Sequence, residues 1–192
     1  MRKALGATLL SVALVVGIAG APAHAGRKVT VVDSPNDAHR GIDMHRVTFK
    51  KLKGSIQIRT TFSHMARNLN GVQYYFDTKK SRPGPEFGAV INRDKDGDRL
   101  TSAHVYRMNS WTKPGAEIVC ATAHRWRINP NGTGAFTARF AYGCLKVKPK
   151  KLVRATVRTW DYTKYLGTGE LRRGSFGYND LMRTRRTFSP WF

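Results

Sequence analysis

Acidic residues are scarce in this chain. Only 12 Asp and Glu stand against 34 Lys and Arg in 192 residues, which gives a formal net charge of +22. A field of this size draws a protein toward polyanions but says nothing about its fold. The glutamates are Glu86, Glu117 and Glu170, and no pattern marks two carboxylates as the pair that glycoside hydrolysis requires. The composition therefore favours binding of an anionic partner over catalysis.

Motifs for nucleophilic and metal chemistry are also missing. Ser175 lies in Gly-Ser-Phe-Gly, which lacks the residue between the first glycine and the serine that a nucleophile elbow needs. No glycine-rich phosphate loop follows a predicted strand. Five histidines lie beyond the N-terminal segment without HxH or HExxH spacing: His39, His45, His64, His104 and His124. We predict a protein that is not an enzyme and holds no metal or cofactor.

Long apolar runs are confined to the N-terminus. Arg2 and Lys3 precede the apolar segment Leu9–Ile18, and Ala23-His24-Ala25 supplies a small-x-small cleavage pattern. The alternative, a transmembrane anchor, needs roughly 20 apolar residues. We predict that residues 1–25 are a secretion signal cleaved after Ala25 and that the product is extracellular, with no membrane span. The mature product, without residues 1–25, would have 167 residues and a formal charge of +20.

Cysteine occurs only twice, at Cys120 and Cys144. An even pair in an exported chain favours a disulfide, whereas two cysteines without a CxxC spacing make a poor zinc site. Both lie in the segment Glu117–Leu145, where two alternating stretches flank a turn containing Asn131 and Gly132. Both turn residues tolerate positive φ. We predict a β-hairpin stapled near its open end.

Alternation of apolar and polar residues recurs along the chain without helical periodicity, repeats or a linker. This pattern predicts an all-β fold, a single-domain antiparallel β-sandwich of the immunoglobulin or jelly-roll kind. The sandwich would span residues 26–162, and residues 163–192 would form a Gly- and Arg-rich extension that packs on it through Trp191 and Phe192. The other predicted strands are Val29–Val32, Ile42–Phe49, Ser55–Phe62, Val72–Asp77, Phe87–Asn92, Leu100–Met108 and Val153–Tyr162.

Several short motifs resemble those of exported, largely uncharacterised actinobacterial proteins expected to be β-sandwiches. They are Asp33 and Asp37, Ile42-Asp43 with Val47, Tyr75-Phe76-Asp77-Thr78 leading into Pro85-Glu86-Phe87, the cysteine pair around Trp126, and Trp191. This resemblance implies a fold and a compartment, with no activity attached. The opening is also similar to sandwiches related to DOMON and family 9 carbohydrate-binding modules. That second resemblance implies sugar or haem binding, but no ligand-contacting residue is matched here.

Arginines alternate with core residues along the predicted strands and should point away from the core. The candidate binding residues are Arg59, Arg125, Arg127, Arg139, Arg154 and Arg158, with Trp160 and Tyr162 among them. The planar guanidinium suits phosphate and carboxylate because it can bond two oxygens at once, and aromatic rings stack on sugars or bases. The hypothesis is binding of an anionic polymer or glycan of the cell envelope.

Four other interpretations of these residues stay open. The basic residues can simply keep a sheet surface soluble. The Trp and Tyr side chains can serve as platforms for neutral carbohydrate. Nucleic acid can be bound without sequence specificity. The least favoured is a wall-active hydrolase, which needs two acidic side chains in one cleft.

Two sets of acidic residues are candidates for a cation site. The stretch Asn92–Asp98 looks like half a calcium loop, but Ala103 stands where an EF-hand needs Glu, and basic residues intervene. Asp96-Gly97 is a good hairpin turn by itself, so a turn is favoured. Asp33, Asp37 and Asp43 are likewise predicted to make turn hydrogen bonds rather than hold a metal.

Overall fold

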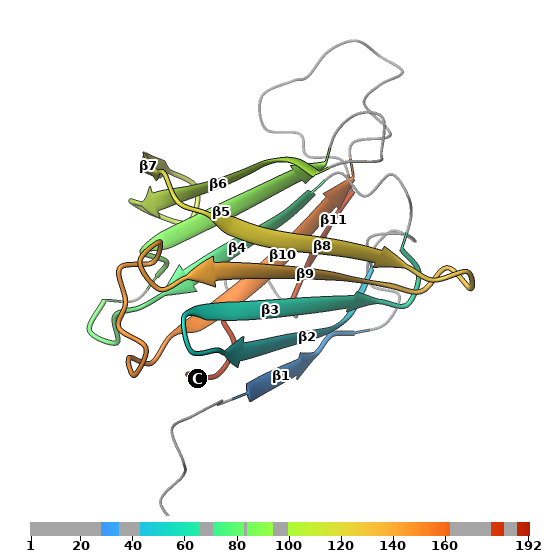
Figure 1. The fold of residues 1–192 in the computed structure, drawn as a ribbon, viewed down its shortest axis with the longest axis horizontal. Helices are drawn as coiled ribbons and strands as arrows, with labels where there is room; N and C mark the ends of the chain where they lie inside the picture. The colour runs from blue at the N-terminus through green and yellow to red at the C-terminus, as the bar shows by residue number, and fades with distance from the viewer. Residues whose placement is uncertain are drawn as a thin grey trace, which may run out of the picture.

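The computed structural model describes residues 28–34, 43–65, 71–82, 84–93, 100–161, 178–182 and 188–192. Over these residues the chain forms antiparallel strands in two sheets that face each other (Figure 1). The predicted all-β sandwich is therefore confirmed. None of the described residues belongs to a helix of the length and apolarity that a bilayer crossing demands.

The first sheet has five strands in the order β1-β2-β3-β9-β8. Their bounds are Lys28–Val32 for β1, Met44–Lys51 for β2, Ser55–Phe62 for β3, Gly134–Ala141 for β9 and Thr122–Ile128 for β8. β3 has the predicted bounds and faces: Ile56, Ile58 and Phe62 are buried, whereas Arg59 is exposed.

The second sheet has six strands in the order β11-β10-β4-β5-β6-β7. Their bounds are Tyr178–Leu181 for β11, Arg154–Asp161 for β10, Gly71–Asp77 for β4, Phe87–Arg93 for β5, Leu100–Met108 for β6 and Pro114–Ile118 for β7. β11 lies within the segment 163–192 that the sequence pattern treats as an extension. The chain thus returns to the sheet after β10.

The core between the sheets is built around Tyr74 of β4, which is fully buried. Its ring packs edge-on against Phe140 at 5.2 Å and lies 6.4 Å from Phe136, both on β9. Phe76 meets the same Phe140 at 5.1 Å. Burial raises the pKa of Tyr74 well above its usual value, partly offset by the hydroxyl of Thr60. These contacts tie β9 to the opposite sheet.

The predicted hairpin is formed by β8 and β9, with Thr122 opposite Phe140 at its open end. Cys120 and Cys144 form a disulfide there, with their Cα atoms 5.7 Å apart, as predicted. The first arm is shorter than predicted, however. Pro114–Ile118 pairs with β6 in the other sheet, because the chain changes sheets between residues 119 and 121.

The turn of this hairpin uses only one of its two predicted left-handed residues. Gly132 has φ +82°, whereas Asn131 is not among the residues with positive φ. Instead, the Asn131 side chain accepts hydrogen bonds from the backbone N–H and the hydroxyl of Thr133. The positive φ favours glycine here, and a Cβ on Gly132 would also approach the ring of His64 to 2.9 Å, so that the His64 side chain would have to move.

The segment 188–192 lies against the start of β10. Backbone hydrogen bonds join Phe192 to Val153 in both directions, at 2.9 and 3.1 Å, and Ser189 N–H donates to the carbonyl of Ala155 at 2.8 Å. Phe192 is fully buried and stacks on Phe49 of the five-stranded sheet at 5.3 Å. This aromatic contact fastens the two sheets together at one end.

Candidate functional site

Charge is segregated between the two sheets. The strands of the five-stranded sheet contain eight Lys or Arg residues and no Asp or Glu. The strands of the six-stranded sheet contain four basic and four acidic residues. The net charge of the sandwich strands is therefore carried entirely by one sheet.

Seven of these eight basic side chains are exposed on the outer face of the five-stranded sheet. The exception is Lys51, which is buried and donates to the carbonyl oxygens of Pro149 and Lys151. The seven, called here the basic face, are Lys28, Arg46, Lys50, Arg59, Arg125, Arg127 and Arg139. Like charges on neighbouring strands repel, so a surface of this kind costs stability unless an anion neutralises it.

Strand register explains why four of the five arginines of the basic face, all except Arg46, lie close together. Thr137 of β9 lies opposite Arg59 of β3 on one side and opposite Arg125 of β8 on the other. Arg139 is two residues along β9, and Arg127 is two residues along β8. Side chains two apart on a strand share a face and are about 7 Å apart.

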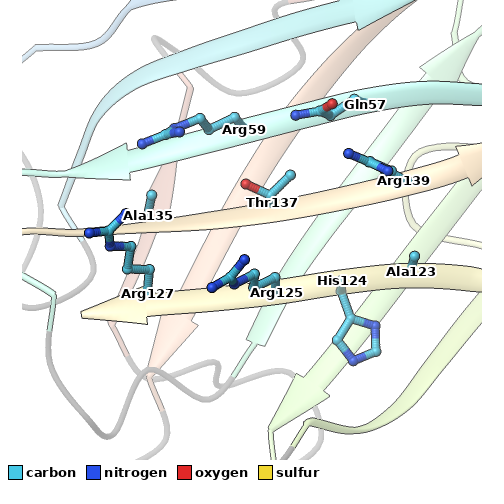
Figure 2. Close-up of a pocket in the computed structure, with 9 residues that line it drawn as sticks. All are labelled: Gln57, Arg59, Ala123, His124, Arg125, Arg127, Ala135, Thr137 and Arg139. Carbon is cyan, nitrogen blue, oxygen red and sulfur yellow. The ribbon is translucent and has the colours of Figure 1, made fainter. Parts of the chain in front are cut away.

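Figure 2 shows these four arginines around a shallow hollow of about 420 Å³. Its lining is Gln57, Arg59, Ala123, His124, Arg125, Arg127, Ala135, Thr137 and Arg139. No carboxylate or thiol is among these residues, so the two-acid geometry of a hydrolase is not met in this hollow. The side chains that line it are mainly hydrogen-bond donors, and the four guanidinium groups give it a positive charge.

Among the described residues that line the hollow, His124 is the one ionisable group besides the arginines. Its side chain leaves β8 in a different direction from that of Arg125 (Figure 2). Burial lowers the pKa of His124 below its usual value of 6.5. The imidazole is therefore neutral at neutral pH, and the positive charge of the hollow comes from guanidinium groups alone.

The other two predicted arginines do not belong to this surface. Arg154 and Arg158 lie on β10 in the six-stranded sheet. Arg154 donates from Nε to the buried carboxylate of Asp77 at 2.8 Å and forms an ion pair with it at 2.7 Å. Its guanidinium also lies 4.8 Å from the ring of Phe188 and 4.9 Å from that of Trp191. Arg154 therefore has a structural partner, whereas no ion pair joins the four arginines of the hollow to any carboxylate within the described ranges.

Of the two predicted aromatic binding residues, Trp160 belongs to β10 of the six-stranded sheet, whereas the hollow lies on the five-stranded sheet. Tyr162 lies outside the described residues. Trp126 of β8 packs inward on Phe136 at 4.2 Å.

The remaining described tryptophans are packed against neighbours. Trp111 lies between Tyr75 at 5.2 Å and Phe188 at 4.8 Å. The ring of Trp191 is approached by the cations of Arg154 and Lys80. Stacking on a sugar needs an open ring face, so these contacts disfavour the carbohydrate alternative.

The candidate cation sites have less support. Of the loop Asn92–Asp98, residues 94–98 lie outside the described part, as does Asp37. Asp33 and Asp43 are buried, and Asp43 accepts a hydrogen bond from Ser63 at 3.0 Å. Within the described ranges, no three His, Cys, Asp or Glu side chains come together as metal ligands would.

Sequence reasoning missed three members of the basic face: Lys28, Arg46 and Lys50. A signal for them was present, because β1 and β2 also alternate and their outward positions include these three basic residues beside Thr30 and Thr48. In the structure Lys28 lies opposite Lys50, and Lys50 lies opposite Gln57 of the hollow. The basic face thus extends across the sheet from β8 to β1.

Comparison with known proteins assigns no family. No protein-family model matches the chain, and no solved structure matches it. A stretch of 91 residues is 32% identical to the TodF product hydratase of Pseudomonas putida. That stretch is 47% of this chain and 34% of the hydratase, so the chain spans about a third of that relative's length. The hydratase name describes that protein, and the match is too partial to carry it further.

Proposed function

We propose that this is an exported, non-catalytic protein that binds an anionic polymer of the cell envelope through the basic face. The observation that carries the proposal is the charge segregation: eight basic and no acidic residues in one sheet, balanced charges in the other. Basic residues kept for solubility would be spread over both faces, because both meet water. Concentrating them on one face gives a directed field.

The chemistry of the hollow supports the same proposal. Arg59, Arg125, Arg127 and Arg139 are exposed, and among the described residues none of them has a carboxylate partner. Their guanidinium forks are free to bond two oxygens of a phosphate, sulfate or carboxylate group. Release of condensed counterions from the polymer then supplies the driving force.

The test compares two charge reversals of equal size on opposite sheets. Arg125→Glu with Arg127→Glu alters the hollow, and Arg107→Glu with Lys113→Glu alters exposed positions at β6 and the loop after it. We expect the first pair to lose most of its retention on heparin and teichoic-acid resins, and the second to elute close to the wild type. Equal loss from both pairs would show that net charge alone governs retention and would refute the proposal.

Salt dependence provides the second measurement. The logarithm of the binding constant should fall with the logarithm of salt concentration with a slope of about −0.7 to −0.9 for each anionic group contacted. Each arginine removed from the hollow should therefore reduce the magnitude of the slope by about 0.7 to 0.9. Binding that survives salt on a glycan array would favour neutral carbohydrate instead.

A further inference from the structure

The hollow continues beyond the four arginines as a groove along β9. A second hollow, of about 610 Å³, shares Arg59, Arg127 and Ala135 with the first. It extends to the far end of the hairpin and is lined there by hydroxyl and amide side chains: Thr61, Ser63, Asn129 and Thr133. The two hollows are thus neighbouring parts of one groove.

The groove exists because small and long side chains alternate between neighbouring strands. The outward residues of β9 at its floor are Ala135 and Thr137, whereas Arg59 on β3 and Arg125 and Arg127 on β8 form the walls. Figure 2 shows the short side chains of β9 lying between these longer ones. Since neighbouring strands are about 4.8 Å apart, the two walls are about 10 Å apart.

We propose that this groove holds a single linear polyanion lying along β9, with phosphate or sulfate groups on the arginines. The inference rests on the proposed function and adds the shape and direction of the ligand. Outward positions along a strand recur about every 7 Å, so Arg139, Arg125 and Arg127 offer successive cations to a chain that follows β9. A flat anionic bilayer would instead meet the tips of all seven basic side chains and leave the groove floor untouched.

Phosphate or sulfate is favoured over other anions by the donors present. The oxygens of a phosphate or sulfate group are arranged tetrahedrally, whereas those of a carboxylate lie in one plane, so such a group can meet donors from both walls and from the floor. The groove supplies both guanidinium forks and the hydroxyls of Thr137 and Thr61. Nucleobases and sugar rings would need an aromatic surface. Among the described residues that line the two hollows, Phe62 is the one Phe, Tyr or Trp, and it is buried in the core. The other rings are the imidazoles of His45 and His124, which are smaller than the platforms that stack on bases.

The decisive variant fills the groove without changing charge. Ala135→Leu places a larger apolar side chain on the floor, and Ala141→Leu makes the same change at an exposed position of β9 that lines neither hollow. Binding to long-chain inorganic polyphosphate and to heparin is measured by titration calorimetry. Binding to vesicles with anionic lipid is measured by sedimentation, and circular dichroism checks the fold.

We expect Ala135→Leu to lower the affinity for both polymers by about tenfold or more, because the polymer can no longer reach the arginines, with Ala141→Leu within about twofold. Wild-type affinity in Ala135→Leu would overturn the groove while leaving the charge-based function in place. Tighter wild-type binding to vesicles than to polymers would also overturn it. Failure of the wild type to bind any polymer would refute the proposed function itself.

A second variant keeps the inference testable if Ala135→Leu misfolds. Thr137→Glu places a carboxylate between Arg59 and Arg125, its neighbours across the strands, where it should pair with them and raise the melting temperature. Thr30→Glu makes the same charge change on β1, outside the groove. We expect Thr137→Glu to abolish polymer binding and Thr30→Glu to weaken it slightly. Equal weakening by both would contradict a localised groove.

Discussion

Replacing Arg154 should damage stability and spare binding, whereas replacing Arg125 should do the reverse. The carboxylate of Asp77 is fully buried, and it accepts bonds from Arg154 and, at 3.1 Å, from the backbone N–H of Lys79. Removing one partner of a buried ion pair costs about 3 to 5 kcal/mol because an uncompensated charge remains. The Arg154 side chain is 30% exposed, so water can enter its place when it is removed and partly solvate the carboxylate of Asp77.

We therefore expect Arg154→Met to lower the free energy of unfolding by about 3 kcal/mol, at the low end of the range for buried pairs. For a chain of this length that corresponds to a fall in melting temperature of about 6 to 12 °C. Arg125→Met removes an exposed side chain and should change stability by about 0.5 kcal/mol at most. Urea unfolding followed by tryptophan fluorescence, with heparin affinity measured on the same samples, checks both.

Asp77→Asn supplies the matched control for this prediction. The double variant Asp77→Asn with Arg154→Met leaves no buried charge, so it should be less destabilised than the sum of the two single changes. The reasoning is refuted if Arg154→Met unfolds at the wild-type urea concentration. It is refuted equally if Arg154→Met loses as much heparin affinity as Arg125→Met, since Arg154 would then be part of the binding surface.

Three further changes test the supports of the sandwich. Replacing Cys120 and Cys144, which are 24 residues apart, by Ser removes the disulfide that closes this loop. In the chain-entropy model the free energy of unfolding should fall by about 3.5 kcal/mol, which urea unfolding measures. Phe192→Ala removes a fully buried ring from its contact with Phe49 and should cost about 3 to 5 kcal/mol. Because the folded pKa of His124 is lowered from 6.5, its contribution to stability is complete above pH 6.5 and falls as pH drops below that value. His124→Gln should make the melting temperature less sensitive to pH between 7.5 and 5.5, as calorimetry can show, and an unchanged pH dependence would argue against this source.

The strands were predictable from local pattern because their side-chain period is two residues and one face must be buried. β3 and β6 have the predicted bounds, and the cysteine pair follows from two residues at the ends of one hairpin. Positions that depend on distant partners were not predictable. Period-two alternation places Arg154 outward on its strand. It cannot reveal that β10 belongs to the six-stranded sheet, or that Asp77 of the neighbouring β4 forms an ion pair with Arg154.

The same limit explains the other differences between pattern and structure. The alternating run from Glu117 to Ile128 reads as one strand, yet the chain changes sheets at Cys120 because β6 offers an edge to Pro114–Ile118. β11 lies in a Gly- and Arg-rich segment whose composition does not mark a strand, and its pairing with β10 is a tertiary contact. Local sequence specifies faces and turns, whereas sheet membership depends on the whole chain.

The supports of β8 connect the stability of the fold to the proposed binding groove. β8 is an edge strand of its sheet, and edge strands are held on one side only. Here its start is fixed by the disulfide at Cys120, its middle by Trp126 packed on Phe136 at 4.2 Å, and its end by the Asn129–Thr133 hydrogen bonds of the turn. Because β8 is fixed at these three points, Arg125 and Arg127 are already in place before a ligand binds. Preorganisation of this kind lowers the entropy cost of binding. The apolar side of β8 thus serves the core, while its polar side presents the cations at a fixed distance from β3.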